Sequence, residues 1–241
     1  MGRKGFFWTR AAPTRASGPY VFQEERRHVA TCARLRARAC DRQGLVTSLV
    51  GMFSELILAS TSQARRSLLD GLGLPYRPLA PEVDELVAEG TPVLQAVAQL
   101  AERKARAVAG RNPRCLVIGA DQLVSLDGQP LGKPPDEAAA FAQLKSLAGR
   151  SHEIATGVCV MGPGYLVTEV DVARLHVRAL SDDEVRGYVA TGEWQGCAGG
   201  YRVEGRGQAL FARIEGDRTS IQGLPMQRVV RLLREAGVRF F

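Results

Sequence analysis

Residues 116–126 read LVIGADQLVSL, and this stretch decides the fold. Its first half, Leu116–Ala120, is a continuous apolar run, which is the pattern of a buried strand. Asp121 follows directly, and a second strand over 123–126 leads into an Asp127-Gly128 turn. We therefore expect a strand with a carboxylate at its end, where α/β sheets commonly place reacting groups.

Strand and helix patterns alternate on both sides of this stretch without internal repeats. Further strands are expected at 56–59, 76–80, 152–161, 165–180 and 208–214, and helices at 62–70, 92–109, 134–147, 181–191 and 225–236. This alternation predicts an α/β fold with a mixed β-sheet flanked by helices.

The 241 residues carry a net charge of +7, which comes from 32 Lys and Arg against 25 Asp and Glu. Residues 1–51 hold 10 of the basic and 3 of the acidic residues, so residues 52–241 hold 22 of each and are neutral. The chain has no run of about 20 apolar residues, which excludes a membrane-spanning helix. The basic excess therefore belongs to the N-terminal segment and not to the folded body.

Residues 1–51 show no sustained periodicity, and no acidic residue occurs before Glu24. An Arg-rich start of this kind is compatible with a transit peptide or with an arm that touches nucleic acid. We favour a disordered extension or an upstream read-in, because Met52 lies four residues before the first clean strand. The domain boundary is thus expected at 51/52, with one domain over 52–241.

The residues Ser60-Thr61-Ser62-Gln63-Ala64-Arg65-Arg66 stand where a strand meets a helix. Basic residues in the first turn of a helix are unfavourable unless an anion lies there. Free N–H groups, hydroxyls and guanidinium groups at such a junction would bind phosphate oxygens. The alternative, a pair of solvated surface arginines, stays open on this segment alone.

Lys104 falls inside the apolar arc of its predicted helix, between Val93 and Val97 on a helical wheel. A lysine on that face needs either an anionic partner or a path for its side chain to solvent. Both remain open at this point.

Asp121 is followed twelve residues later by Lys133, across the hairpin that Asp127-Gly128 closes. A hairpin of that length could bring Lys133 close to Asp121, while Glu82, Asp84 and Glu85 add carboxylates on another loop. Carboxylates with basic residues, and no His or Cys at ligand spacing, suit Mg²⁺ or Mn²⁺ bound to phosphates. A turn cap for Asp121 and a solvated face for the acidic loop are the alternatives.

Seven stretches in order resemble the Maf family of nucleoside triphosphate pyrophosphatases. They are LILASTSQARRSLLDGLGL, PEVDE, AERKARA, VIGADQLVSLDGQPLGKP, HEIATGV, CAGGYRVEG and IEGDRTSIQGLP. Together they cover essentially all of residues 52–241, and their order and spacing make the resemblance specific. The resemblance implies an elongated mixed sheet in two lobes with a nucleotide cleft between them.

The resemblance also implies hydrolysis of the α–β phosphoanhydride of a nucleoside triphosphate, with release of the monophosphate and pyrophosphate. It assigns roles to six residues of this sequence. Ser60, Arg65 and Lys104 would hold phosphates, Lys133 would lie near the scissile bond, and Glu85 and Asp121 would handle a divalent metal and the attacking water. Asp121 corresponds to the proton acceptor of the family, although a mainly metal-binding role for it stays open.

Three positions bear on the choice of base. Gln122 and Glu204 resemble the branch that hydrolyses 7-methyl-GTP, and a carboxylate at 204 can accept from the N–H groups of guanine. Ala64 departs from that branch, which often has a bulky residue there. The alternative is the dTTP/UTP branch of the same family.

The family resemblance also bears on partners and location. It points to a homodimer, and it leaves open a role in arrest of septum formation through partner binding. The five cysteines lack CxxC spacing and no secretory signal is evident, which indicates a cytoplasmic protein with reduced thiols. Nucleic-acid binding would depend on the N-terminal arginines alone, and nothing indicates a membrane partner.

Overall fold

The computed structural model describes residues 53–241, so our expectations for residues 1–51 lie outside it. Its strands form one seven-stranded sheet. They are β1 (Leu56–Ala59), β2 (Arg77–Pro78), β3 (Leu116–Leu126), β4 (Gln129–Leu131), β5 (Ser151–Gly162), β6 (Tyr165–Val177) and β7 (Phe211–Glu215). The helices are α1 (Gln63–Asp70), α2 (Val93–Arg111), α3 (Glu137–Leu147), α4 (Asp182–Val189), α5 (Arg218–Ile221) and α6 (Met226–Glu235).

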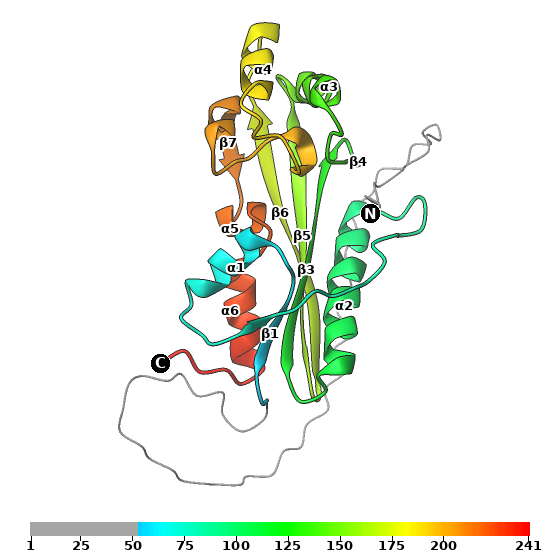
Figure 1. The fold of residues 1–241 in the computed structure, drawn as a ribbon, viewed down its shortest axis with the longest axis vertical. Helices are drawn as coiled ribbons and strands as arrows, with labels where there is room; N and C mark the ends of the chain where they lie inside the picture. The colour runs from blue at the N-terminus through cyan, green and yellow to red at the C-terminus, as the bar shows by residue number, and fades with distance from the viewer. Residues whose placement is uncertain (1–52) are drawn as a thin grey trace. The chain divides into compact units, whose positions relative to one another are not determined.

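The order of the main strands is β2-β1-β3-β5-β6-β7, and β4 pairs with β3 as the return strand of a hairpin (Figure 1). β1 runs parallel to β2 and β3, whereas β5, β6 and β7 join the sheet by antiparallel pairing. The predicted α/β fold with a mixed sheet is therefore confirmed. The arrangement in two lobes with a cleft between them stays a prediction.

The long strand β3 differs from our expectation of two strands separated at Asp121. Asp121 and Gln122 continue the ladder with β5, opposite Gly157 and Thr156. We expected the strand to end at Asp121 because burying an uncompensated carboxylate inside a strand is unfavourable. Here a lysine from α2 compensates its charge, and pairing with β5 holds the backbone extended through it.

The C-terminal part also differs from the sequence-based expectation. Residues 206–210 form a 3-10 turn, and the strand begins only at Phe211. A Cβ on Gly207 would lie 2.3 Å from the carbonyl oxygen of Arg202, so the glycine-rich segment folds closely on itself there. The short helix α5 was not predicted either, because four residues are too few for a periodic pattern.

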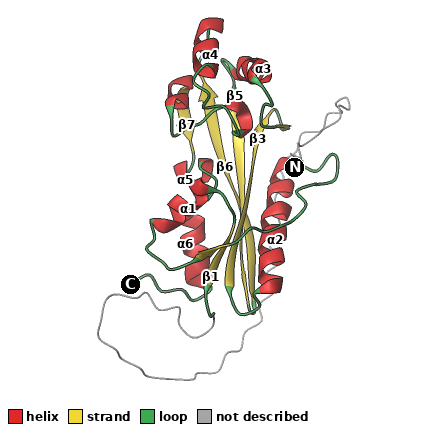
Figure 2. Ribbon diagram, viewed as in Figure 1, coloured by secondary structure: helices red, strands yellow, loops and turns green. Residues whose placement is uncertain are grey.

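The two faces of the sheet carry different helices, as Figure 2 shows in red and yellow. Odd-numbered positions of β1 and β3 pack with α2, and the neighbouring even-numbered positions pack with α1 and α6. This follows from the two-residue period of strands. A third cluster unites α3 and α4 with Val124 and Leu126, so Asp121 falls between hydrophobic clusters along β3.

The helix α2 lies very close to the sheet because two glycines face it. A Cβ on Gly119 would lie 2.3 Å from the carbonyl oxygen of Ala101, and one on Gly157 would lie 2.3 Å from that of Val97. Gly157 is also the ladder partner of Asp121. The absence of side chains at these positions thus brings α2 within reach of the strand that carries the carboxylate.

Membrane spanning was tested on the same residues. No helix within 53–241 combines the length and the apolar character that crossing a bilayer requires.

Candidate active site

Three charged side chains meet at the middle of β3. The Nζ atom of Lys104 lies 2.5 Å from Asp121 Oδ1 and 2.7 Å from Glu85 Oε1. Lys104 and Asp121 are only 6% and 7% exposed, whereas Glu85 comes from an exposed loop that precedes α2. Lys104 therefore lies on the inward face of its helix and has anionic partners, which is the first of the two possibilities left open by its sequence position.

The environment of Asp121 changes its acidity. Burial raises the pKa of Asp121 above the ordinary aspartate value, and the charge of Glu85 acts in the same direction. The charges of Lys104 and Arg65 oppose this rise. A carboxylate with a raised pKa is a better proton acceptor than an ordinary aspartate.

Local hydrogen bonds order the junction of β1 and α1, where the basic residues begin. The hydroxyl of the buried Ser60 accepts a hydrogen bond from the backbone N–H of Ser62 at 3.1 Å. Ser62 in turn caps α1, since its hydroxyl accepts from the backbone N–H of Arg65. No acidic residue occupies the first turn of α1, so this positive helix end keeps its attraction for an anion.

The guanidinium of Arg65 is held between this junction and the carboxylates. Its Nε donates to the carbonyl oxygen of Gly223 at 2.8 Å, and its Nη1 donates to the hydroxyl of Ser60 at 3.5 Å. Burial lowers the pKa of Arg65, and the charges of Asp121 and Glu85 act against that shift. The structure thus brings Ser60, Arg65, Lys104, Asp121 and Glu85 into one site.

Gln122 lies on the opposite face of β3 from Asp121, because the two are adjacent in a strand. Its amide nitrogen contacts the Thr156 hydroxyl at 3.0 Å and the carbonyl oxygens of Ser220 and Ile221 at 2.8 and 3.0 Å. The Gln122 amide therefore binds the backbone at the end of α5. Two residues after Ile221, the carbonyl oxygen of Gly223 accepts the hydrogen bond from Arg65. A role in base choice stays a prediction for this residue.

The candidate base-reading residue Glu204 lies in a second group of charges. Burial raises the pKa of the Cys197 thiol, and the charges of Arg202 and Lys133 lower it while that of Glu204 raises it further. The charges of all three side chains thus act on the Cys197 thiol, and Glu204 itself is exposed.

Lys133 follows the hairpin that β3 and β4 form. The hairpin pairing ends with Leu131 opposite Val124, so the chain leaves β3 before it reaches the level of Asp121. Lys133 is exposed, and within residues 53–241 no ion pair joins it to Asp121. Its role near a scissile bond stays a prediction.

The glycine-rich segment that carries Glu204 also touches β3. A Cβ on Gly199 would lie 3.3 Å from a methyl group of Val124, so the glycine-rich segment lies against that residue. Val124 is three residues from Asp121, which corresponds to about 10 Å along a strand. Ala64 lies in the first turn of α1, beside Arg65, and presents only a methyl group.

A buried pair of rings supports the segment that carries Glu204. His152 Nε2 and the Tyr201 hydroxyl lie 2.5 Å apart, and the Tyr201 ring packs edge-on against Phe211. Burial lowers the pKa of His152 to about 4, so its ring is neutral at physiological pH. Neither ring had a predicted role.

The donor set at Asp121 bears on metal binding. Within residues 53–241 no three His, Cys, Asp or Glu side chains are arranged to hold a metal ion. Asp121 and Glu85 nevertheless offer two carboxylates that converge on one point, the Lys104 ammonium. Mg²⁺ commonly takes one or two protein carboxylates and completes its shell with waters and substrate phosphates. The residues present fit a hard cation of that kind.

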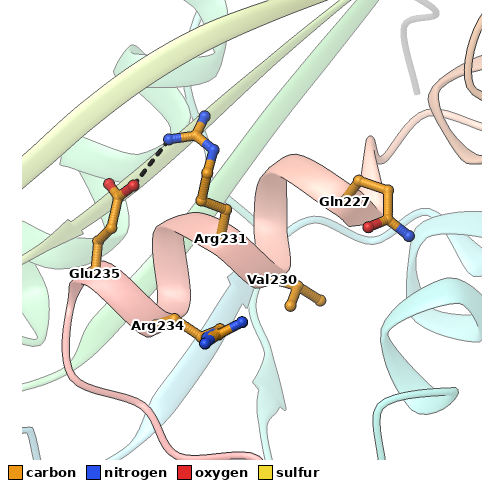
Figure 3. Close-up of a pocket in the computed structure, with 5 residues that line it drawn as sticks. All are labelled: Gln227, Val230, Arg231, Arg234 and Glu235. Atoms are coloured by element: carbon orange, nitrogen blue, oxygen red, sulfur yellow. Dashed lines mark hydrogen bonds and ion pairs between the residues drawn. The ribbon is translucent and has the colours of Figure 1, made fainter.

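Two surface cavities lie away from this site. One of about 610 Å³ is lined by side chains of α6, where Arg231 and Glu235 form an ion pair (Figure 3). Another of about 400 Å³ lies between α3 and α4. Neither is lined by Asp121 or Arg65, so the candidate site is defined by its charged groups.

Fold and site together define a class: an α/β protein with a buried carboxylate–lysine pair beside a basic helix end, suited to an anionic ligand. The sequence profile of the family described as Maf-like protein matches residues 55–236. The chain therefore belongs to the Maf family, as its motifs predicted.

Relatives in this family carry two different substrate names. The "dTTP/UTP pyrophosphatase" of Symbiobacterium thermophilum is 43% identical, over 78% of this chain and 96% of its own length. The "7-methyl-GTP pyrophosphatase" of Albidiferax ferrireducens is 42% identical, over 77% and 94%, and that of Xanthomonas campestris is 44% identical, over 77% and 98%. The predicted enzyme class, a nucleoside triphosphate pyrophosphatase, is confirmed. Because the relatives carry two different substrate names, they do not decide which nucleobase this chain prefers.

Several residues that organise the site were not predicted. Thr156 lies in the quoted stretch HEIATGV and Gly223 in IEGDRTSIQGLP, yet neither received a role. Arg103 stands beside Lys104 and contacts the loop of Glu85. All three residues lie in family-like stretches, since Arg103 is part of AERKARA. Apart from that, nothing in the sequence distinguished Arg103 from a solvated surface arginine.

Proposed function

We propose that this chain hydrolyses the α–β phosphoanhydride of 7-methyl-GTP, with a divalent cation, to give the nucleoside monophosphate and pyrophosphate. The observation that carries the reaction is the buried Asp121–Lys104 pair, with Glu85 and Arg65 beside it. A site with one buried base and several cations suits water attack on a highly charged phosphate chain.

The chain's own residues account for binding and proton transfer. Arg65, the Ser60 hydroxyl and the free N–H groups of α1 bind phosphate oxygens. Asp121 accepts a proton from water as the water oxygen bonds to the α-phosphorus, and pyrophosphate leaves with the bridging oxygen. Lys104 stabilises the ionised form of Asp121 between turnovers.

Asp121 and Glu85 would hold the divalent cation. When bound, it would neutralise charge on the phosphate oxygens and favour departure of pyrophosphate. The convergence of these two carboxylates supports this assignment.

Glu204 supports the choice of base. Its carboxylate is exposed, and it belongs to the glycine-rich segment whose Gly199 lies against Val124 of β3. A carboxylate accepts from guanine N1–H and N2–H₂ and favours the positive charge of the methylated ring.

The test is a pyrophosphate-release screen of the wild-type chain and Glu204→Gln against 7-methyl-GTP, GTP, dTTP and UTP. We expect Glu204→Gln to lower kcat/KM for 7-methyl-GTP by roughly tenfold or more, the scale of one hydrogen bond to a charged group. Turnover of UTP should change much less.

Two results would contradict the proposal at different levels. Equal losses on 7-methyl-GTP and UTP would remove the base-reading role of Glu204. A wild-type preference for dTTP and UTP would move the chain to the other named branch, and no pyrophosphate from any nucleotide would refute the reaction.

A further inference from the structure

Arg103 binds the backbone on both sides of Glu85. Its Nη1 atom donates to the carbonyl oxygen of Asp84 at 2.8 Å and to that of Leu86 at 2.7 Å. These residues immediately precede and follow Glu85. Bonds from a charged donor to neutral acceptors are stronger than bonds between neutral groups.

A second contact fixes the same turn from within. The Asp84 carboxylate accepts from the backbone N–H of Leu86 at 3.0 Å, which closes a turn around Glu85. Asp84 and Leu86 are themselves exposed, and the Leu86 side chain is 65% exposed, so apolar packing contributes little to holding this segment. The hydrogen bonds from Arg103 and to Asp84 therefore determine where Glu85 lies.

The orientation of Glu85 matters because its carboxylate reaches a buried group. Glu85 Oε1 lies 2.7 Å from the Lys104 Nζ atom, which also pairs with Asp121. Arg103 and Lys104 are neighbours on α2, so one helix turn holds both the backbone and the carboxylate of Glu85. An untethered loop would have to lose its conformational entropy each time Glu85 entered the site.

We propose that Arg103 is a positioning residue, which holds the turn around Glu85 so that this carboxylate meets the Lys104–Asp121 pair before substrate binds. Its effect on turnover rests on the proposed function, whereas its effect on the loop does not. Arg103 thus acts through Glu85 and makes no contact with the reacting atoms.

The same loop offers a matched control. Arg111, two turns further along α2, pairs with Glu82 at 2.6 Å near the start of the loop. Arg111→Gln removes a tether of similar chemistry from the same segment, but not the one that flanks Glu85. It should therefore leave the turn around Glu85 and the kinetic constants nearly unchanged.

The first experiment measures amide hydrogen exchange over residues 82–88 in the full chain without ligand. Arg103→Gln should speed exchange of the Leu86 amide by roughly tenfold, since it removes two hydrogen bonds from a charged donor. Arg103→Lys should restore part of the protection, because both bonds come from a single nitrogen. Unchanged exchange in Arg103→Gln, or an equal effect of Arg111→Gln, would overturn the proposal whatever the enzyme's activity.

The second experiment is a double-mutant cycle on pyrophosphate release. Arg103→Gln should lower kcat and raise the Mg²⁺ concentration needed for half-maximal rate, with little change in KM for the nucleotide. In a Glu85→Gln background it should cause no further loss, because Arg103 acts only through Glu85. Additive losses would overturn the positioning role, whereas a wild-type chain inactive on every nucleotide would refute only the proposed function.

Discussion

At the scale of single residues, the site depends on one buried carboxylate and the cations around it. Asp121 would be expensive to bury alone, and removal of one partner of such a pair leaves an uncompensated charge. Lys104, Arg65 and burial act on its pKa in opposite directions, and burial prevails. The outcome is an aspartate that remains a base but protonates more readily than usual.

The pH dependence of turnover should show this raised pKa. Because the ionised form of Asp121 accepts the proton, kcat/KM should fall as the pH falls through its pKa, with an inflection above the ordinary aspartate value of about 4. Asp121→Asn should still fold, because Glu85 continues to pair with the Lys104 ammonium, and it should lose roughly 10²- to 10⁴-fold in kcat, the usual contribution of a general base. Steady-state rates from pH 4 to 9 and a circular dichroism spectrum of the variant test both points. Substantial metal-dependent activity in Asp121→Asn would contradict the assignment.

At the scale of elements, the site exists because α2 lies against β3 and β5. The glycines at 119 and 157 permit this, and the pairing of Asp121 with Gly157 places one of these two close approaches opposite the carboxylate. On the other face, Gln122 and Thr156 bind α5, whose following turn presents the carbonyl that holds Arg65. Adjacent residues of β3 thus organise the two faces of the sheet.

Gly157→Ala should therefore destabilise the chain and weaken catalysis together. Its Cβ would lie 2.3 Å from the carbonyl oxygen of Val97, and overpacking of this kind costs about 1–3 kcal/mol. The free energy of unfolding from urea titration, and kcat at a temperature where the variant is folded, would measure both effects.

Gly110→Ala, on the helix α2 that Gly157 faces, is the control. A Cβ there meets no atom within 4 Å, so the substitution should stabilise the chain by about 0.5–1 kcal/mol through reduced backbone entropy. Equal stability of Gly157→Ala and the wild-type chain would show that α2 does not lie as close to the sheet as described.

At the scale of the whole molecule, the excess of basic residues and the residues of the candidate site lie in different parts of the sequence. The family profile covers residues 55–236, and residues 52–241 are electrically neutral despite the net charge of +7 for the chain. The basic groups of the site concern the oxygens of one ligand and not an extended polyanion.

A chain that begins at Met52 should accordingly keep full pyrophosphatase activity and lose its retention on a cation exchanger at neutral pH. Activity per folded molecule, measured beside the full-length chain, tests the first point. Binding of the full-length chain to nucleic acid that falls steeply with salt and disappears on truncation would support a working arm at residues 1–51. A truncated chain that folds but is inactive would contradict the proposed domain boundary.

The sequence by itself determined the alternation of strands and helices, the mixed sheet and the family, because these depend on local periodicity and on the order of short motifs. It also placed Lys104 on the inward face of a helix. It did not predict β3 as one strand, since the partner that compensates Asp121 lies 17 residues away in α2. Nor did it predict that the hairpin pairing ends at Val124 and Leu131, before the level of Asp121.

Only the tertiary structure decided which charges meet. Arg65 joins Gly223 across 158 residues, and Gln122 joins the backbone of α5 across 98. Arg103 donates hydrogen bonds to the turn around Glu85, although its neighbours in the sequence do not distinguish it from a surface arginine. Such contacts depend on the close approach of helix and sheet, and local sequence carries no measure of that distance.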